Sequence, residues 1–292
     1  MKVVATLVVR NLRIFFRDRM GVFLSLLSAL ILLLLYTLFL GSQQVSSLND
    51  SFGKGAEVSV DGFVNSWVFA GILMTTTVTT GLAAMNIFVE DRYAGRFKEF
   101  LVSPVSKLQL AAGYLLAAFT VAVVMSLIVF GVGLAIFAAT GQARLSIVEI
   151  FQTLGYLLLL CLTFSAMAAF GASFIKSSGG FTSLSTIVGT GIGFLAGSFV
   201  PVGVLPDSVA NVINALPFSQ AAMLMRQPLV ADQLSKLAEV NAPAAKEVGL
   251  VYGMSINVGD WVPTSLQVIM ILLGVFLVFA GLSSLRIRSR IG

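Results

Sequence analysis

The chain has 292 residues, of which 58% are apolar and only 11% are charged, and its formal net charge is +5. A soluble domain carries about 25% charged residues, so the composition indicates a membrane protein. The absence of histidine excludes a histidine-ligated metal site and a histidine-based catalytic triad, and a single cysteine excludes an internal disulfide.

Residues 1–19 are predicted to form an amphipathic helix. Its polar face holds Lys2, Thr6, Arg10, Arg13 and Arg17, and its apolar face holds Val4, Leu7, Val8, Leu12 and Phe15. A basic helix with one apolar face is typical of a helix in the lipid headgroup plane. The apolar run that follows has 20 residues, longer than the roughly 7–15 of a signal peptide, so we expect a retained span.

Six apolar segments follow, and none of them contains an acidic residue, a basic residue or a histidine. They cover residues 21–40, 64–89, 109–138, 150–174, 180–200 and 264–285. A bilayer core about 30 Å thick needs roughly 20 apolar residues per helix. We therefore expect an all-α membrane protein with six transmembrane helices and an N-terminal amphipathic interfacial helix. Residues 1–292 would form a single domain, with short external re-entrant-type helices after the fifth span.

The basic residues predict the orientation of the chain. Thirteen of the 18 Lys and Arg residues fall on the side that holds both termini. Because Lys and Arg in short loops mark the cytoplasmic side, we expect both termini in the cytoplasm. The same distribution explains the positive net charge without a nucleic-acid partner.

The uncharged spans also narrow the mechanism. A carrier driven by protons or sodium usually keeps an ionisable residue at membrane depth, and a channel or carrier shows a selectivity filter or inverted repeats. A membrane-embedded enzyme needs converging acids, bases or metal ligands in its spans. The predicted spans contain none of these features, so we expect the energy for transport to come from elsewhere.

The predicted cytoplasmic loop after the second span, residues 90–103, forms a short charged helix that Pro104 stops. Glu90 and Asp91 suit the positive end of a helix, and Phe97 and Phe100 contribute to one apolar patch. Two interpretations remain open here: a helix that docks a cytoplasmic partner, and a solvated loop helix lying on the membrane.

The loop resembles the region after the second span in type 2 ATP-binding-cassette (ABC) exporter permeases. The matching residues are Glu90, Asp91, Gly95, Leu101, Ser103, Pro104 and Val105. A second similar stretch follows the fifth span: Phe199, Pro201, Leu205 and Pro206, then Pro217 and Arg226. Residues 1–19 are similar to the elbow helix of that family.

The resemblance implies a separate ATPase subunit, with two permeases and two ATPases in the working unit. The second permease would be another copy of this chain or a paralogue. ATP and Mg would sit on the ATPase, and this chain would bind no cofactor. The coupling helix over residues 90–103 would contact the ATPase through Glu90, Asp91, Arg92, Gly95, Arg96, Phe97, Phe100, Ser103 and Pro104. The chain itself lacks the G-x-x-x-x-G-K-[ST] loop that cradles nucleotide phosphates.

Spans two and five carry the candidate translocation path and dimer interface. A stripe at helical spacing in span two holds Phe69, Ile72, Thr76, Thr79, Ala83 and Asn86. Span five holds Thr182 and Thr186 beside Gly189, Gly193 and Gly197, whose spacing allows a second helix to approach closely. Both patterns are equally typical of helix packing within one chain, and the sequence leaves that alternative open.

The extracytoplasmic segment, residues 201–263, is predicted to contain helices near 207–216 and 219–239. The resemblance implies that Phe199, Pro201, Leu205, Pro206 and Pro217 form an external gate segment. The stretch 227–260 is longer than expected for the family; it is a tolerated loop insertion or a partner-binding cap, and we favour the former. Trp67 and Trp261 are expected to be interfacial anchors.

Taken together, these features predict the membrane subunit of an ATP-driven exporter in a bacterial plasma membrane. It would move a small hydrophobic or amphipathic compound, such as a drug, an antibiotic or a lipid-like toxin, by alternating access. This function would contribute to multidrug resistance. A polysaccharide or lipid-linked glycan is the alternative substrate, and a channel or secondary carrier is the alternative class.

Overall fold

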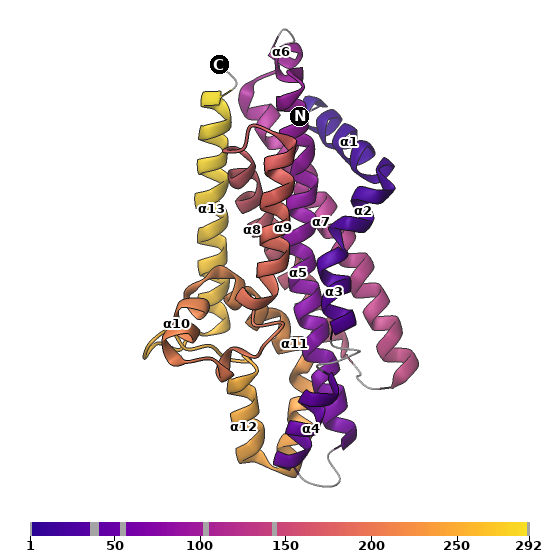
Figure 1. Cartoon of the computed structure of the whole chain (residues 1–292), viewed down its shortest axis with the longest axis vertical. Helices are drawn as coiled ribbons and strands as arrows, with labels where there is room; N and C mark the ends of the chain where they lie inside the picture. Colours follow the sequence, from indigo (N-terminus) through magenta and orange to yellow (C-terminus); the bar gives the residue numbers. More distant parts are fainter. Residues whose placement is uncertain (1, 36–40, 53–56, 102–104, 142–144, 291–292) are drawn as a thin grey trace.

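The computed structural model describes residues 2–35, 41–52, 57–101, 105–141 and 145–290 (Figure 1). In chain order, the helices are α1 (Lys2–Arg17), α2 (Arg19–Ser25), α3 (Leu27–Leu35), α4 (Gly41–Phe52), α5 (Glu57–Tyr93), α6 (Arg96–Leu101) and α7 (Lys107–Thr140). They continue with α8 (Ile147–Ala172), α9 (Ser178–Leu195), the 3₁₀ turn η2 (Val202–Val204), α10 (Asp207–Ala215), α11 (Pro217–Val240), α12 (Ala242–Val251) and α13 (Ser265–Arg290). The expected all-α class is confirmed.

Four helices of the described chain are long and apolar enough to cross a membrane. They are α7, α8, residues Val60–Tyr93 of α5 and residues Ser265–Ile287 of α13. These correspond to the second, third, fourth and sixth predicted spans. The long helices run side by side along the long axis of the molecule (Figure 1).

The first and fifth predicted spans are not among the described helices that are long and apolar enough to cross a membrane. Residues 21–35 form α2 and α3 with a break at Leu26, and residues 36–40 lie outside the described part. The fifth predicted span corresponds to α9, whose 18 residues extend about 27 Å, but its many Gly, Ser and Thr residues make it less apolar than a membrane span requires. The count of six spans stays a prediction.

Helix α5 is the centre of the fold. Its most apolar 18-residue window is 94% buried, whereas that of α13 is only 17% buried. It packs against α7, α8, α9 and α11, and also against α3 and α4. Because α5 is covered on all sides while α13 keeps a broad apolar face exposed, α13 has the character of a lipid-facing helix.

Local sequence signals set several helix boundaries. Ser106 and Gln109 form a capping box at the start of α7, and Ser146 and Glu149 form another at the start of α8. At the end of α7, Gly141 has a φ of 67°, a left-handed conformation that glycine adopts without steric cost. These signals place the polar connections at the two ends of the bundle.

The extracytoplasmic segment is mostly helical. The predicted helices appear as α10 and α11, and the stretch predicted as a loop insertion contains the end of α11 and all of α12. It is thus an ordered helical hairpin, since α11 and α12 pack against each other. Buried apolar residues such as Val230 and Leu237 hold it together.

The two tryptophans differ in their environments. Trp261 is 44% exposed near the start of α13, as an interfacial anchor would be. The prediction for Trp67 is wrong because this side chain is only 1% exposed. Its indole N–H donates a hydrogen bond to the carbonyl of Tyr252 over 2.8 Å, so Trp67 is a core residue.

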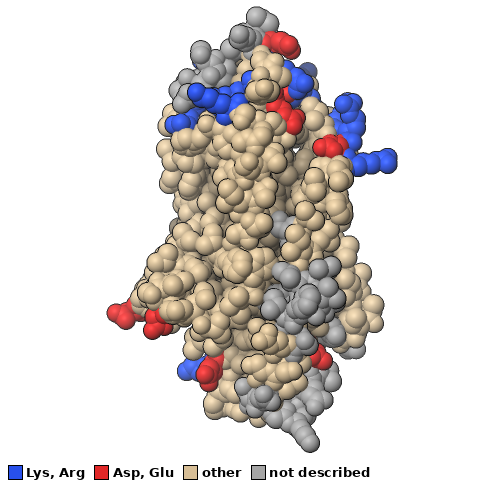
Figure 2. All heavy atoms as spheres, in the orientation of Figure 1, with Lys and Arg blue, Asp and Glu red and all other residues tan. Residues whose placement is uncertain are grey.

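Charge is unevenly distributed along the molecule. Figure 2 shows most of the visible Lys and Arg side chains gathered at the end that holds α1 and α6. The helices α4 and α12 lie at the opposite end (Figure 1).

Arg17 and Arg13 of α1 are exposed, while Leu7, Asn11 and Phe15 are buried. Leu7 packs directly over Gly113 of α7, where a Cβ would lie 2.9 Å from the leucine Cβ.

Candidate functional site

A sharp corner divides the predicted coupling helix, residues 90–103: Glu90 to Tyr93 form the last turn of α5, and α6 covers Arg96–Leu101. Helix α5 ends at Tyr93, and Gly95 in the following turn has a φ of 72°. The Gly95 amide donates to the carbonyl of Arg92 over 3.2 Å, which closes the turn. A residue with a side chain would be strained in this left-handed conformation. The glycine therefore lets α6 begin at Arg96, at the extreme end of the molecule (Figure 1).

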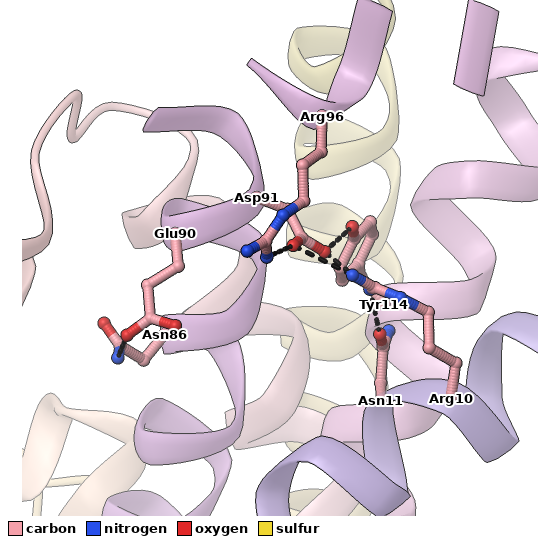
Figure 3. A network of polar contacts seen from close by, with 7 residues as sticks. All are labelled: Arg10, Asn11, Asn86, Glu90, Asp91, Arg96 and Tyr114. Carbon is pink, nitrogen blue, oxygen red and sulfur yellow. Dashed lines mark hydrogen bonds and ion pairs between the residues drawn. The ribbon is translucent and has the colours of Figure 1, made fainter. Parts of the chain in front are cut away.

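Asp91 is the centre of a polar cluster at this corner (Figure 3). Its carboxylate is fully buried and accepts two hydrogen bonds from Arg10 of α1, at 2.6 and 3.0 Å. Arg96 of α6 donates a third at 2.6 Å, and the hydroxyl of Tyr114 on α7 donates a fourth at 2.5 Å. One carboxylate thus joins α1, α5, α6 and α7.

The geometry of this cluster is that of a strong ion pair. Arg10 binds both carboxylate oxygens of Asp91 in a fork, which is the strongest and most directional arginine–carboxylate arrangement. The hydrogen bond to Asp91 raises the pKa of the Arg10 guanidinium above its usual value. A second acceptor, the side-chain oxygen of Asn11, lies 2.9 Å from the same guanidinium and fixes its orientation.

Aromatic rings support the corner from below. Phe97 of α6 is buried against Phe88 of α5 and Tyr114 of α7, with ring centroids 5.4 and 6.0 Å away. The predicted apolar patch therefore turns inward at Phe97 and binds α6 to its own chain. Phe100 lies in α6, but its side chain is outside the described part, as are Ser103 and Pro104.

Arg92 links α5 in the other direction. Its guanidinium donates to the carbonyl of Ser173 over 3.1 Å and to that of Ile175 over 3.4 Å. Both acceptors belong to the connection between α8 and α9. Because Asp91 and Arg92 are neighbours, the end of α5 is tied to α1, α6 and α7 on one side and to the α8–α9 connection on the other.

The exposed residues of the corner differ from those expected. Asp91 and Phe97 are buried and Arg92 is half-buried, so the side chains of these three residues are not freely accessible to a partner protein. The side chains that face outward are those of Glu90, Tyr93, Arg96 and Glu99. Sequence reasoning missed Tyr93 and Glu99, although both lie inside the predicted coupling helix. It also missed the role of Arg10 and Tyr114, which no local motif could reveal because they are distant in sequence from Asp91.

The candidate path residues of α5 are packed within the chain. Phe69, Ile72, Thr76 and Thr79 are buried, while Ala83 and Asn86 are half-buried. The hydroxyls of Thr76 and Thr79 bond carbonyls of their own helix, at 2.7 and 3.1 Å. The amide of Asn86 donates to Glu90 over 2.6 Å. These threonines are therefore satisfied without water or a ligand.

Phe69 shows how tightly this stripe is packed. Its ring lies over Gly133 of α7, where an added Cβ would come within 2.0 Å of the ring. Phe130 and Phe137, also of α7, contact the ring at centroid distances of 6.4 and 5.2 Å. In this conformation the contacts favour the packing interpretation for the part of the stripe around Phe69.

All three glycines of the stripe are buried within the chain. Gly189 and Gly193 lie within α9, and the ring of Phe199 folds over Gly193, where a Cβ would meet it at 2.4 Å. Gly197 follows the end of the helix with a φ of 61°. Thr182 and Thr186 lie two turns before Gly189 and Gly193 on the same face of α9, but there the helix is exposed.

The predicted external gate segment begins at the Phe199 ring that folds over Gly193. Phe199 contacts Phe194 at a centroid distance of 4.8 Å, and Pro201 is buried just before η2. Leu205 is half-buried, Pro206 precedes α10, and Pro217 occupies the first position of α11, where a proline suits a helix. The structure thus brings four of the five residues to the outer end of α9, and Pro217 begins the helix that returns from it.

Comparison with known proteins agrees with this arrangement. Residues 42–285 match the sequence profile of the ABC-2 family transporter proteins. No curated protein gives a significant match. Since the profile covers most of the chain and includes α5, the corner, α9 and the external segment, the chain belongs to the ABC-2 family of transporter proteins, the permease subunits of type 2 ABC exporters.

Proposed function

We propose that the chain is the permease of an ATP-driven exporter and that the corner between α5 and α6 receives the force from a separate ATPase subunit. One observation carries the proposal: the buried carboxylate of Asp91 fixes α6 to α1, α5 and α7 at the basic end of the molecule. Because α6 is short and rigidly attached, a displacement of α6 also displaces the long helices to which it is bound.

The two-sided attachment of the corner supports a switch between two conformations. ATP binding would close a pair of ATPase subunits and move the two coupling helices. Through Asp91 the movement reaches α1 and α7, and through Arg92 it reaches the connection that precedes α9. Since α5 and α9 form the predicted path, both of its walls would respond to one input, which is what alternating access requires.

We further propose that two copies of the chain assemble with two ATPases. The exposed side of α9 supports this arrangement, because small polar residues such as Thr182 and Thr186 stand beside exposed apolar ones such as Ile187. Small residues allow close approach of helices in a membrane. A second copy or a paralogue would cover this side of α9 and complete the path.

The distribution of charge supports a bacterial plasma-membrane location with six spans and cytoplasmic termini. In this arrangement α1 is the interfacial elbow helix, α2 and α3 belong to the first span, and α9 is the fifth. The uncharged, largely apolar character of α9 and of residues 64–89 in α5 favours a hydrophobic or amphipathic substrate, such as a drug, an antibiotic or a lipid-like toxin.

The test is co-expression with a candidate ABC ATPase subunit, purification of the complex in detergent, and measurement of ATP hydrolysis. Tyr93→Ala and Glu99→Lys change only exposed residues of the corner. Loss of a contact at an interface typically costs about 1–2 kcal/mol, so we expect the affinity for the ATPase to fall about 5- to 30-fold. Glu239→Lys, at the opposite end of the molecule, is the matched control and should bind normally.

Two results would contradict the proposal. One is a purified chain that transports or conducts without any ATPase. The other is an ATPase complex whose affinity and hydrolysis are unchanged by both corner variants.

A further inference from the structure

Arg226 is a charged side chain completely buried in the external half of the molecule. It lies on α11 and is 0% exposed. A buried charge is costly unless specific partners compensate for it. The partners that surround this guanidinium therefore indicate why an arginine occupies the position.

The guanidinium binds the end of α9. Its Nη2 atom donates to the carbonyl oxygens of Ala196 and Gly197, each over 2.8 Å. These carbonyls follow the last residue of α9, where the helix dipole is negative and carbonyl groups lack partners in the helix. Arg226 thus supplies, from a different helix, the cap that the end of α9 requires.

An aromatic face completes the site. The guanidinium lies 5.3 Å from the ring centroid of Trp67 on α5, which is within the range of a cation–π interaction. Trp67 is itself held by its hydrogen bond to the Tyr252 carbonyl and by an edge-on contact with the Tyr252 ring at 5.1 Å. Helices α5, α9 and α11 and the turn after α12 therefore meet at one side chain.

Two glycines lie beside the guanidinium, and one of them, Gly253, leaves the space that it occupies. Gly197 and Gly253 have φ angles of 61° and 70°, which favour glycine. A Cβ on Gly253 would lie 2.6 Å from the Nη1 atom of Arg226. The arginine therefore explains Gly253, whereas a Cβ on Gly197 would lie 2.4 Å from Val202 Cγ2 and 3.6 Å from Nη2 of Arg226, so Gly197 is explained by the turn that ends α9 and by Val202.

The segment held in this way is the external gate segment. Directly after the capped carbonyls, Ser198 packs against Gly71 of α5, where a Cβ would lie 2.7 Å from the serine Oγ. Phe199 then folds over Gly193. The contact between the two predicted path helices at their outer ends therefore depends on where α9 stops, and Arg226 fixes that point.

We infer that Arg226 is a positioning residue for the outer gate: by capping α9 against Trp67 it keeps the segment after α9 closed on α5. The inference rests on the proposed exporter function. Lysine should replace it only in part: an ammonium group can donate to the two carbonyls that Nη2 binds, but it lacks the planar guanidinium that lies over the indole of Trp67. Weakening the cap should open the contact between Ser198 and Gly71 to the outside.

The experiment uses thiol labelling from the external side. Cys161 is the only cysteine, so Cys161→Ser gives a background without thiols, into which Ser198→Cys introduces a reporter at a position that is 1% exposed. Cells are treated with a membrane-impermeant maleimide. We expect slow labelling with Arg226 intact, labelling at least tenfold faster with Arg226→Gln and a smaller increase with Arg226→Lys, together with reduced export per ATP hydrolysed.

Two further variants make the result decisive. Ser235→Cys, exposed on the outer part of α11, should label rapidly and equally in every background. Trp67→Phe keeps an aromatic ring but loses the indole N–H, and it should give an intermediate increase in labelling. If the arginine variants do not reach the membrane, the Trp67→Phe result decides the question alone.

Unchanged labelling of the Ser198→Cys reporter in the variants that reach the membrane, with normal export, would overturn the inference and leave the exporter function intact. Labelling that responds as expected in a chain that binds no ATPase would instead overturn the proposed function, while the capping role of Arg226 would stand. If the Arg226 variants lose ATPase binding while labelling of the Ser198→Cys reporter is unchanged, the outer-gate role is refuted as well. Arg226 would then act at a place other than the outer gate.

Discussion

Replacement of Asp91 by asparagine removes the negative charge that Arg10, Arg96 and Tyr114 share, and changes little else in size. Removal of one partner from a fully buried ion pair typically costs about 3–5 kcal/mol. Here the side chains of Arg10 and Arg96 keep 29% and 49% of their exposure, so water can compensate for part of the loss. We therefore expect a destabilisation of about 2–3 kcal/mol, since a hydrogen bond to a charged group contributes about 1.5–3 kcal/mol.

The assay is thermal unfolding of the purified chain in detergent, followed by ATP hydrolysis of the complex. For a chain of this size, about 2–3 kcal/mol corresponds to a decrease in Tm of about 5 °C. Because Asp91 holds α6 in place, stimulation of the ATPase should fall further than binding of the ATPase does. Arg10→Ala should have a similar effect, and the double variant should cost less than the sum of the two, since both remove the same pair.

Glu90→Gln is the matched control, since it changes the neighbouring acid by the same chemistry. Glu90 is exposed and its partner Asn86 lies on the same helix, so we expect a change within about 0.5 kcal/mol. If Asp91→Asn unfolds at the wild-type temperature and stimulates the ATPase normally, Asp91 does not hold the corner. Equal decreases in Tm for Glu90→Gln and Asp91→Asn would also refute the reasoning, because burial of the carboxylate would then make no difference to stability.

Three other predictions test separate features. Gly95→Val forces a β-branched residue into a left-handed turn at a cost of about 1–2 kcal/mol, and it should reduce ATPase stimulation; normal stimulation would show that the turn is not required. Gly133→Ala places a Cβ 2.0 Å from the phenylalanine ring of α5 that packs there and should destabilise the chain by about 1–3 kcal/mol, whereas Gly131→Ala, with nothing within 4 Å, should not lower its Tm. Trp67→Phe leaves Trp261 as the only tryptophan; its fluorescence should be quenched by brominated lipids that carry the bromine near the headgroup, and unquenched emission would place Trp261 in water.

Composition and apolar runs predicted most of the architecture. The four long helices have stretches of 26 residues or more, and such long apolar stretches have few alternatives to a membrane span. The break at Leu26 and the short length of α9 were not predictable in this way. Both depend on where the chain turns, and the positive φ of Gly197 that ends α9 is an effect of tertiary packing.

The site was predictable in location but not in the orientation of its side chains. Glu90 and Asp91 are adjacent acids of the same pattern, yet one is exposed and the other fully buried. Successive helical residues differ by about 100° in direction, and only Arg10, Arg96 and Tyr114 decide which acid faces inward. The stripe from Phe69 to Asn86 had a similar ambiguity, because the same spacing describes a helix that lines a path and one that packs in a core.

The length of the central helix has a mechanical consequence. With 37 residues, α5 extends about 55 Å, nearly twice the thickness of a bilayer core, and so it projects beyond the membrane. Such a helix behaves as a lever with its fulcrum near mid-membrane. A tilt of about 5° would displace each end by only about 2 Å, in opposite directions. That displacement is comparable to the contact tolerances at Asp91 and at Ser198, so a small rotation at the basic end is enough to disturb the packing at the opposite one.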